Sequence, residues 1–276
     1  MNNTLLLALI LVSASVTAAM ASSAENHVDA HDSEVHEDGH KSSRQDDGIH
    51  GRPHWGYSGV EGPVHWGSLA KEFSLCGSGK EQSPINIKGE QEMNLLPLEF
   101  HYRDSSHSQV VNNGHTIQVD YAQGSYAIIG GKKFELLQFH FHSPSEHKIH
   151  GKHADLVAHL VHKSAEGNLA VVAILFDRGV KSRFLDSVWR VMPRHKGKAT
   201  VSGTIDITDL LPKEKKVRYF NYRGSLTTPP CSEGVNWNIL LTRASVSSAQ
   251  VKAFERVFPR SVRPIQALNA RIIGVN

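Results

Sequence analysis

Short runs of alternating hydrophobic and polar residues fill the middle of the chain, a pattern typical of β-strands with one buried face. Turn signals such as Asn112-Asn113-Gly114 and Gly130-Gly131 separate these runs. The expected strands are Val110-Val111 and residues 116–121, 126–129, 136–142, 156–162 and 169–176. Because the connections between them are short, we expect these strands to form a mostly antiparallel sheet.

Two stretches instead have the spacing of an amphipathic helix. Residues 180–191 place Phe184, Leu185, Val188 and Trp189 on one stripe, and residues 248–257 form the second stretch. The sequence contains no internal repeat. The pattern therefore predicts a single mainly β (α+β) domain with a few short helices, spanning residues 51–276.

Residues 1–21 have the features of a signal peptide. Residues 5–12 form an unbroken apolar run, and Ala19-Met20-Ala21 offers a small-x-small cleavage site. No Lys or Arg precedes the run, so an uncleaved membrane anchor is the alternative. No later stretch approaches the roughly 18 apolar residues of a spanning helix. We therefore expect a periplasmic or secreted protein that is free of the membrane after signal cleavage.

Residues 22–50 form a polar, acidic segment that contains histidines and no aromatic residue. Such a composition buries too little surface to offset the entropy of ordering, so we expect this segment to be disordered. Loose metal binding and a plain solvated tether are both compatible with it. Its eight acidic and two basic side chains give −6, which leaves +9 on the rest of a chain with net charge +3. The basic residues of that rest are dispersed, so we expect no nucleic-acid partner.

The chain has two cysteines, Cys76 and Cys231. Behind a signal peptide, an even number of cysteines indicates a disulfide bond. Such a bridge would stabilise the fold by restricting the unfolded chain. Two buried free thiols are the alternative.

Gln138-Phe139-His140-Phe141-His142 is the main candidate for chemistry. In a strand, residues two apart face the same side, so His140 and His142 project together. His159, in the next expected strand, completes a set of three imidazoles if the two strands are neighbours. Three neutral nitrogen ligands with an open fourth position are typical of a catalytic zinc site. The alternative is that these are packed histidines, because a chain with 18 of them brings pairs together by chance.

Several longer motifs accompany the histidines. They are His54-Trp55-Gly56-Tyr57, Gln82-Ser83-Pro84-Ile85-Asn86-Ile87, Asn112-Asn113-Gly114-His115 and Gly224-Ser225-Leu226-Thr227-Thr228-Pro229-Pro230-Cys231. In their order and spacing, from about His54 to Arg271, the chain resembles the α-class carbonic anhydrases of exported bacterial type. The resemblance implies a large, twisted, mostly antiparallel sheet and a zinc enzyme that reversibly hydrates CO2 to bicarbonate and a proton. It also implies one Zn²⁺ per chain, held by His140, His142 and His159, and attack on CO2 by a zinc-bound hydroxide.

The resemblance assigns three catalytic residues. Thr227 is similar to the family's gatekeeper threonine, which accepts the proton of the hydroxide and donates its own to a carboxylate, and Glu146 matches that carboxylate. His115 matches the histidine that carries protons between the zinc water and solvent, a task that suits an unperturbed histidine pKa of about 6.5. Without the resemblance, Glu146 is better interpreted as a surface acid and His115 as a surface histidine.

The resemblance also implies two walls around the metal. The residues that would bind CO2 on the apolar side are Val161, Val171, Leu226, Thr227, Thr228 and Trp237, and the polar wall comprises Tyr57, Asn113, His115, Gln118 and Gln138. Gln138 precedes His140 by two residues and can therefore orient that imidazole. Plain core packing is the alternative for each apolar residue. By the same resemblance, the Ser83-Pro84 and Pro229-Pro230 bonds are expected to be cis.

Two more residues of the strand around His159 affect the expected site. Val157 stands where the best-known relatives carry a carboxylate behind this ligand, which puts the usual zinc affinity and hydroxide basicity in doubt. His162 lies three positions after His159 and must therefore face the other side of the strand. We expect His162 to be a packed or solvent-facing histidine.

Two other functions are alternatives. A carbonic anhydrase-like binding module would be expected to lack a zinc ligand or the pair of Thr227 and Glu146, all of which are present here. A periplasmic zinc-binding or zinc-buffering protein with the same fold would hold more than one zinc per chain. The expected small-molecule partners are CO2 and bicarbonate. The sequence leaves the oligomeric state open, with a homodimer as one option.

Overall fold

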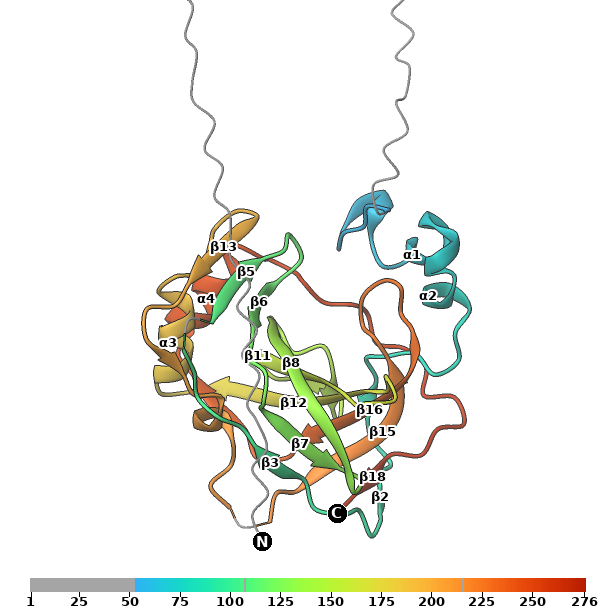
Figure 1. Cartoon of the computed structure of the whole chain (residues 1–276). Helices are drawn as coiled ribbons and strands as arrows, with labels where there is room; N and C mark the ends of the chain where they lie inside the picture. The colour runs from blue at the N-terminus through green and yellow to red at the C-terminus, as the bar shows by residue number, and fades with distance from the viewer. Residues whose placement is uncertain (1–52, 107, 215) are drawn as a thin grey trace, which may run out of the picture. The chain divides into compact units, whose positions relative to one another are not determined.

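A large twisted sheet runs through the computed structural model, which describes residues 53–276 except 107 and 215 (Figure 1). Its strands are β2 (Gln91–Glu92), β3 (Glu99–His101), β5 (Gln109–Asn112), β6 (Ile117–Asp120), β7 (Tyr126–Ile129), β8 (Lys132–His142), β11 (Leu156–Lys163), β12 (Leu169–Arg178), β13 (Gly197–Thr200), β15 (Tyr219–Ser225), β16 (Glu233–Leu240), β17 (Ala244–Val246) and β18 (Gly274–Val275). Two small sheets contain β1 (Asn86–Ile87), β9 (Lys148–Ile149) and β10 (Lys152–His153), and β4 (Ser105–Ser106) and β14 (Thr204–Ile205). The expected signal peptide, 1–21, and acidic segment, 22–50, lie outside the described residues.

Along the main sheet the strand order is β13-β5-β6-β8-β11-β12-β16-β15-β18-β2. Off this path, β7 pairs with β8, β3 pairs with β7, and β17 pairs with β12. Most neighbours are antiparallel, which confirms the expected mostly antiparallel sheet. The parallel pairs are β12 with β16, β12 with β17 and β18 with β2. Short connections could not predict these parallel pairs, because long stretches of chain separate their strands.

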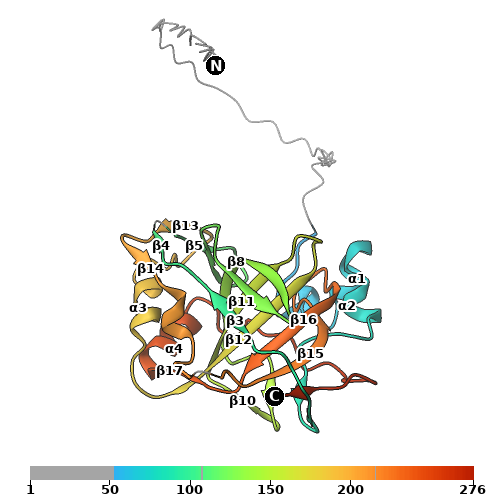
Figure 2. The same ribbon diagram turned by 60° about the horizontal axis from the view of Figure 1, so that its bottom comes forward.

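Four α-helices and three 3₁₀ turns accompany the sheet in the described residues. They are α1 (Trp66–Leu69), α2 (Leu75–Ser78), α3 (Arg183–Trp189), α4 (Ser248–Glu255), η1 (Gly59–Glu61), η2 (Lys71–Phe73) and η3 (Ile207–Leu210). Helices α3 and α4 lie together at one end of the domain, and α1 and α2 lie at the other (Figure 2). None of the helices in this part of the chain has the length and apolar character needed to cross a membrane.

The two expected helices form but are shorter than the patterns over 180–191 and 248–257 suggested. Helix α3 begins after Ser182, whose side chain accepts a hydrogen bond from the Leu185 amide. Helix α4 begins after Ser247, which forms a capping box with Gln250. These side chains satisfy amides that the first turn of a helix leaves without partners, so each helix begins at its cap.

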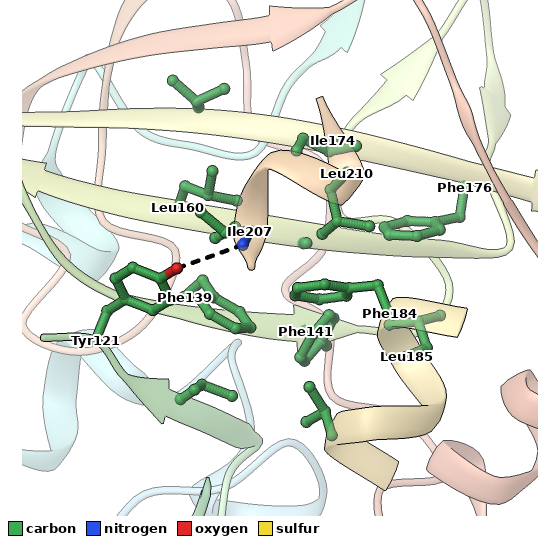
Figure 3. Close-up of a cluster of buried hydrophobic side chains, with 14 of the residues drawn as sticks. Tyr121, Phe139, Phe141, Leu160, Ile174, Phe176, Phe184, Leu185, Ile207 and Leu210 are labelled. Atoms are coloured by element: carbon green, nitrogen blue, oxygen red, sulfur yellow. Dashed lines mark hydrogen bonds between the residues drawn. The ribbon is translucent and has the colours of Figure 1, made fainter. Parts of the chain in front are cut away.

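One face of the sheet packs against α3, α4 and η3. Figure 3 shows Phe139 and Phe141 of β8 beside Phe184 of α3, with Leu210 of η3 in the same cluster. Burial of an aromatic side chain of this size contributes roughly 2–3 kcal/mol to folding. Phe139 and Phe141 therefore fix which way β8 faces. Gln138, His140 and His142, which alternate with them, must point to the opposite side of the sheet.

The opposite face carries a second apolar cluster, which includes Val157, Val161, Val171 and Trp237. Strand β11 alternates between the two faces, because Leu156, Ala158 and Leu160 belong to the first cluster. His159 consequently lies on the same face as Val157 and Val161. This second face carries the candidate site.

Candidate metal centre

Three histidines meet on the second face of the sheet. His140 of β8 lies directly opposite His159 in the antiparallel ladder with β11. His142, two residues further along β8, lies opposite Val157. One ring nitrogen from each of the three histidines lies within 4.8 Å of the others. The two strands are neighbours, which meets the condition set by the sequence, and they bring the three imidazoles together.

The outer nitrogens of two of these rings have acceptors. His140 Nδ1 is 2.9 Å from Gln138 Oε1, as expected for the residue two positions earlier in β8. His142 Nδ1 donates to the backbone oxygen of Ser261 at 2.5 Å. These bonds hold the hydrogen on Nδ1 and leave Nε2 of His140 and His142 free to bind a cation.

His159 is turned differently. Its Nδ1 lies 3.9 Å from Glu146 Oε2, and Nε2 of His142 lies 3.6 Å from the same oxygen. Nδ1 of His159 therefore faces the same space as the free nitrogen of His142. Its other nitrogen, Nε2, is buried and has no hydrogen-bond partner among the described residues.

The three histidines are electrostatically suited to a metal. Burial lowers the pKa of His140 and His159 well below the usual value, and the neighbouring histidines lower them further. Both imidazoles are thus neutral at neutral pH, the form that binds a metal. His142 Nε2 is a buried nitrogen without a partner in this part of the chain, a state that a bound cation relieves. The donor set therefore fits a divalent metal that prefers nitrogen ligands, with one position left open.

Glu146 lies beneath the histidines and is fully buried. Its Oε1 accepts a hydrogen bond of 2.9 Å from the backbone amide of Arg263. Its Oε2 has no hydrogen-bond partner among the residues that the structure describes. The expected hydrogen bond from Thr227, which is also buried, is not formed in this arrangement and stays a prediction.

The expected apolar wall is formed by residues in register on three strands. Val161 of β11 lies opposite Val171 of β12, and Val171 lies opposite Trp237 of β16. Trp237 Nε1 donates to the Ser225 backbone oxygen at 2.9 Å, directly before the segment that carries Leu226, Thr227 and Thr228. This row of Val161, Val171 and Trp237 lies two residues along β11 from the paired His159 and His140, on the same face of the sheet.

The residues of the expected polar wall differ in their surroundings. Gln118 of β6 lies opposite His140, and Gln138 contacts that ring. The hydroxyl of Tyr57 is buried without a partner in the described residues, and burial raises its pKa well above the usual value. Asn113 is exposed, and its side chain accepts hydrogen bonds from the amides of His115 and Thr116. Asn113 therefore shapes the turn that carries His115.

His115 has a different environment from the one expected. Its ring stacks on Trp55, with ring centroids 3.7 Å apart and an angle of 8° between the planes. Lys196 lies over the adjacent Gly114, where an added Cβ would come within 2.1 Å of the lysine Cε. Burial, Lys196 and His54 together lower the pKa of His115 to about 4. The expectation of an unperturbed pKa near 6.5 is therefore wrong for this position of the ring.

Comparisons with known proteins identify the family of the chain. The model of the eukaryotic-type carbonic anhydrase family matches residues 61–276. The chain belongs to this family. It is 42% identical over 222 residues to a carbonic anhydrase of Neisseria gonorrhoeae, covering 80% of this chain and 87% of that protein. It is 43% identical to a carbonic anhydrase of Pectobacterium atrosepticum, covering 80% and 90%.

A solved structure extends the similarity to three dimensions. The α-carbonic anhydrase of Thermovibrio ammonificans, in complex with the inhibitor sulfanilamide, superposes with a TM-score of 0.77. The two sequences are 44% identical, and the match covers 81% of this chain and all of the other. The chain is a carbonic anhydrase, a lyase that hydrates CO2.

A disulfide joins Cys76 and Cys231 in this carbonic anhydrase, with Cα atoms 5.1 Å apart. The Cys231 amide donates to the Thr228 oxygen at 2.8 Å, so the bridge lies next to the segment with Thr227. The Ser83-Pro84 and Pro229-Pro230 bonds are cis, as expected, and Ser143-Pro144 is also cis.

Sequence reasoning missed several groups around the carbonic anhydrase site. The Ser261 carbonyl orients His142, and a backbone oxygen leaves no signal in the sequence. Trp55 was part of a recognised motif, but its stacking on His115 requires the three-dimensional fold. His162 is packed, as expected, and its Nε2 lies 2.7 Å from the Tyr102 hydroxyl.

His147 was also missed, although it directly follows Glu146. The residue is fully buried beside His159 and Trp237. Burial, followed by the charges of His142 and Arg271, lowers its pKa to about 3. His147 is therefore a neutral imidazole next to a candidate metal ligand.

Proposed function

We propose that this carbonic anhydrase hydrates CO2 at a single zinc ion held by His140 Nε2, His142 Nε2 and His159 Nδ1. The observation that carries the proposal is the convergence of three imidazoles on one space, with their ligand atoms within 4.8 Å of one another. Three neutral ligands preserve the full charge of a divalent ion, and three ligands leave one tetrahedral position for a reactant.

When bound, zinc supplies a strong nucleophile at neutral pH by acidifying a water molecule, a chemistry for which carbonic anhydrases are the standard example. The protein must then orient that nucleophile, admit CO2 beside it and remove a proton. The fixed directions of the His140 and His142 rings serve the first task. Gln138 and Ser261 keep the rings of His140 and His142 from turning, because each accepts the hydrogen of the outer nitrogen.

Glu146 and Thr227 are proposed to orient the attacking group. The Arg263 amide fixes one oxygen of Glu146 and leaves Oε2 available as an acceptor. A Thr227 hydroxyl that donates to this oxygen must present its own lone pair toward the metal side. That lone pair accepts a hydrogen from the attacking group and fixes the direction of attack in advance, which lowers the cost of reorganisation during the reaction.

The apolar row is proposed to hold CO2. Val161, Val171 and Trp237 are nearly fully buried and present no free polar group to the substrate, since the Trp237 nitrogen is bonded to Ser225. An uncharged, apolar molecule gains from contact with such a surface, while water does not. Leu226 and Thr228 flank the gatekeeper residue and are proposed to complete the binding site for CO2 and bicarbonate.

His115 is proposed to carry the proton to solvent. It is half-buried on the turn held by Asn113, so its ring is partly open to solvent. Its lowered pKa makes it a weak proton acceptor while it lies on Trp55 beside Lys196. Proton transfer through His115 therefore depends on how strongly its burial on Trp55 and the charge of Lys196 disfavour its protonated form.

Stopped-flow CO2 hydration on protein of known metal content tests the proposal. Chelated protein is expected to lose nearly all activity, and one equivalent of zinc per chain to restore it. His142→Ala should not recover with zinc, whereas the exposed control His101→Ala should behave like the wild type. Full activity without metal would contradict the proposal. Activity that requires several zinc ions per chain would favour the zinc-buffering alternative, which the family membership does not favour.

Export is proposed as well, to the periplasm or beyond the cell. The apolar run over residues 5–12 with the cleavage motif at 19–21 supports it. The Cys76–Cys231 bond supports it independently, because such bonds persist in oxidising compartments. N-terminal sequencing of the protein from its native cells should begin close to Ser22. A mature chain that starts at Met1 in the cytoplasm would contradict export.

A further inference from the structure

The three candidate zinc ligands are not supported equally. His140 and His142 each give the outer hydrogen to an oxygen, whereas Nε2 of His159 is buried and has no partner among the described residues. Val157 lies two residues before His159 on the same face of β11, is fully buried, and has no atom that can accept a hydrogen bond. The ligand thus lacks the acceptor that orients a metal-binding imidazole and raises its basicity.

A second buried nitrogen without a partner lies close by. His147 is fully buried, and its Nδ1 has no hydrogen-bond partner in this part of the chain. The ring centroids of His147 and His159 are 6.3 Å apart, and both rings pack against Trp237, at 4.6 and 4.9 Å. The two rings are nearly perpendicular, with an angle of 79° between their planes. Buried polar atoms are rarely left unsatisfied, and two on neighbouring rings can satisfy each other if one carries a hydrogen and the other does not.

The other hydrogen bonds of the two rings allow one of these nitrogens to carry a hydrogen and the other a lone pair. A metal on Nδ1 of His159 leaves the ring hydrogen on Nε2. On His147, Nε2 lies 2.7 Å from the Tyr222 hydroxyl and can donate to it, which leaves Nδ1 with a free lone pair. The Tyr222 hydroxyl in turn lies 2.7 Å from Ser83 Oγ and can donate onward. In this arrangement His159, His147 and Tyr222 each have an acceptor for the hydrogen that they donate.

We propose that His147 is a positioning residue for the metal, whose Nδ1 accepts the hydrogen of His159 Nε2, directly or through one water molecule. His147 thus supplies, as a neutral group, the hydrogen-bond acceptor that the side chain of Val157 cannot supply. The proposal rests on the proposed ligand set. A neutral acceptor increases the basicity of His159 less than a charged one does, so this carbonic anhydrase holds its zinc through one weakly supported ligand.

A double-mutant cycle of zinc release tests the proposal. His147→Phe removes the acceptor and keeps a ring, and Val157→Glu supplies a carboxylate on the face of His159. Zinc loss from the holoenzyme to excess chelator should become about 10- to 100-fold faster in His147→Phe and slower by a similar factor in Val157→Glu. In the Val157→Glu background, His147→Phe should change the rate by less than about threefold, because the carboxylate has replaced the acceptor.

Two controls separate positioning from packing. Val157→Leu, an apolar change without an acceptor, should leave zinc release within about twofold of the wild type. His147→Gln, which keeps an acceptor oxygen, should release zinc more slowly than His147→Phe and thus reverse part of the acceleration. Equal effects of His147→Phe in both backgrounds, or no effect in either, would overturn the proposal.

Imidazole ¹⁵N NMR on the wild-type protein gives a second test that does not depend on the variants folding. Nδ1 of His147 should show the shift of an unprotonated acceptor, and Nε2 of His159 should carry a hydrogen. A hydrogen on Nδ1 of His147 would overturn the proposal. Failure of the protein to bind zinc at these histidines would instead refute the proposed function, and the ¹⁵N spectra of the metal-free protein would still report whether the two rings interact.

Discussion

His140 and His159 lie directly opposite each other in the antiparallel ladder between β8 and β11. Their neighbours Phe139 and Leu160 are also paired and point into the apolar core on the other face of the sheet. A shift of one residue in this register would turn every side chain of β11 over and remove His159 from the site. The packing of the first face therefore positions the ligands on the second.

Lys196 is expected to control the proton-transfer step by lowering the pKa of His115. Lys196→Gln removes a positive charge beside the ring, so the pKa of His115 should rise by on the order of half a unit, the size of a screened interaction between two charges. NMR titration of His115 measures the shift. Turnover in weak buffer should rise with it.

Lys198 supplies the matched control for Lys196. It is also an exposed lysine of the same segment, and no contribution from it to the pKa of His115 is resolved. Lys198→Gln should leave both the pKa and the turnover unchanged. An unchanged pKa in Lys196→Gln would show that Lys196 does not contribute to the value. Equal shifts in the two variants would show that the effect of Lys196 is not specific to its position.

The Cys76–Cys231 bond is expected to contribute strongly to stability. It spans 155 residues, so restriction of the unfolded chain is worth at most about 5 kcal/mol. Replacing both cysteines with serine should lower the free energy of unfolding by roughly 3–5 kcal/mol in urea titrations. Equal stability of the variant and the oxidised wild type would count against this contribution.

His162 is expected to make the fold sensitive to acid. Burial lowers its pKa to about 4, while the pKa in the unfolded chain is about 6.5. The unfolded state therefore binds the proton first, and stability falls as the pH drops from about 6.5 to about 4, by up to roughly 3 kcal/mol. His162→Gln should flatten this dependence in unfolding titrations at a series of pH values. Parallel curves for variant and wild type would contradict the assignment.

Much of the ligand set could be predicted from local sequence. The two-residue period of a strand placed His140 and His142 on one face and Phe139 and Phe141 on the other, and burial of both phenylalanines bears this out. Short connections predicted a mostly antiparallel sheet, and the antiparallel pairing of β8 with β11 agrees with it. That these two strands are neighbours was only a condition of the prediction, because residues 143–155, with β9 and β10, separate them.

Local patterns could not predict contacts between distant parts of the chain. The carbonyl that orients His142 comes from Ser261, 119 residues later, and involves no side-chain signal. The lowered pKa of His115 depends on Trp55 and Lys196, which lie on either side of it in the sequence. Contacts between distant parts of the chain determine both the hydrogen bond of His142 and the pKa of His115, and neither composition nor periodicity predicts such contacts.

Zinc-edge anomalous diffraction from crystals of the full protein tests the central claim most directly. It locates the metal without relying on activity and identifies the ligand atoms. The account predicts one zinc per chain, about 2.0–2.1 Å from Nε2 of His140, Nε2 of His142 and Nδ1 of His159. Zinc bound through Nε2 of His159, or bound elsewhere with these three nitrogens free of metal, would contradict it.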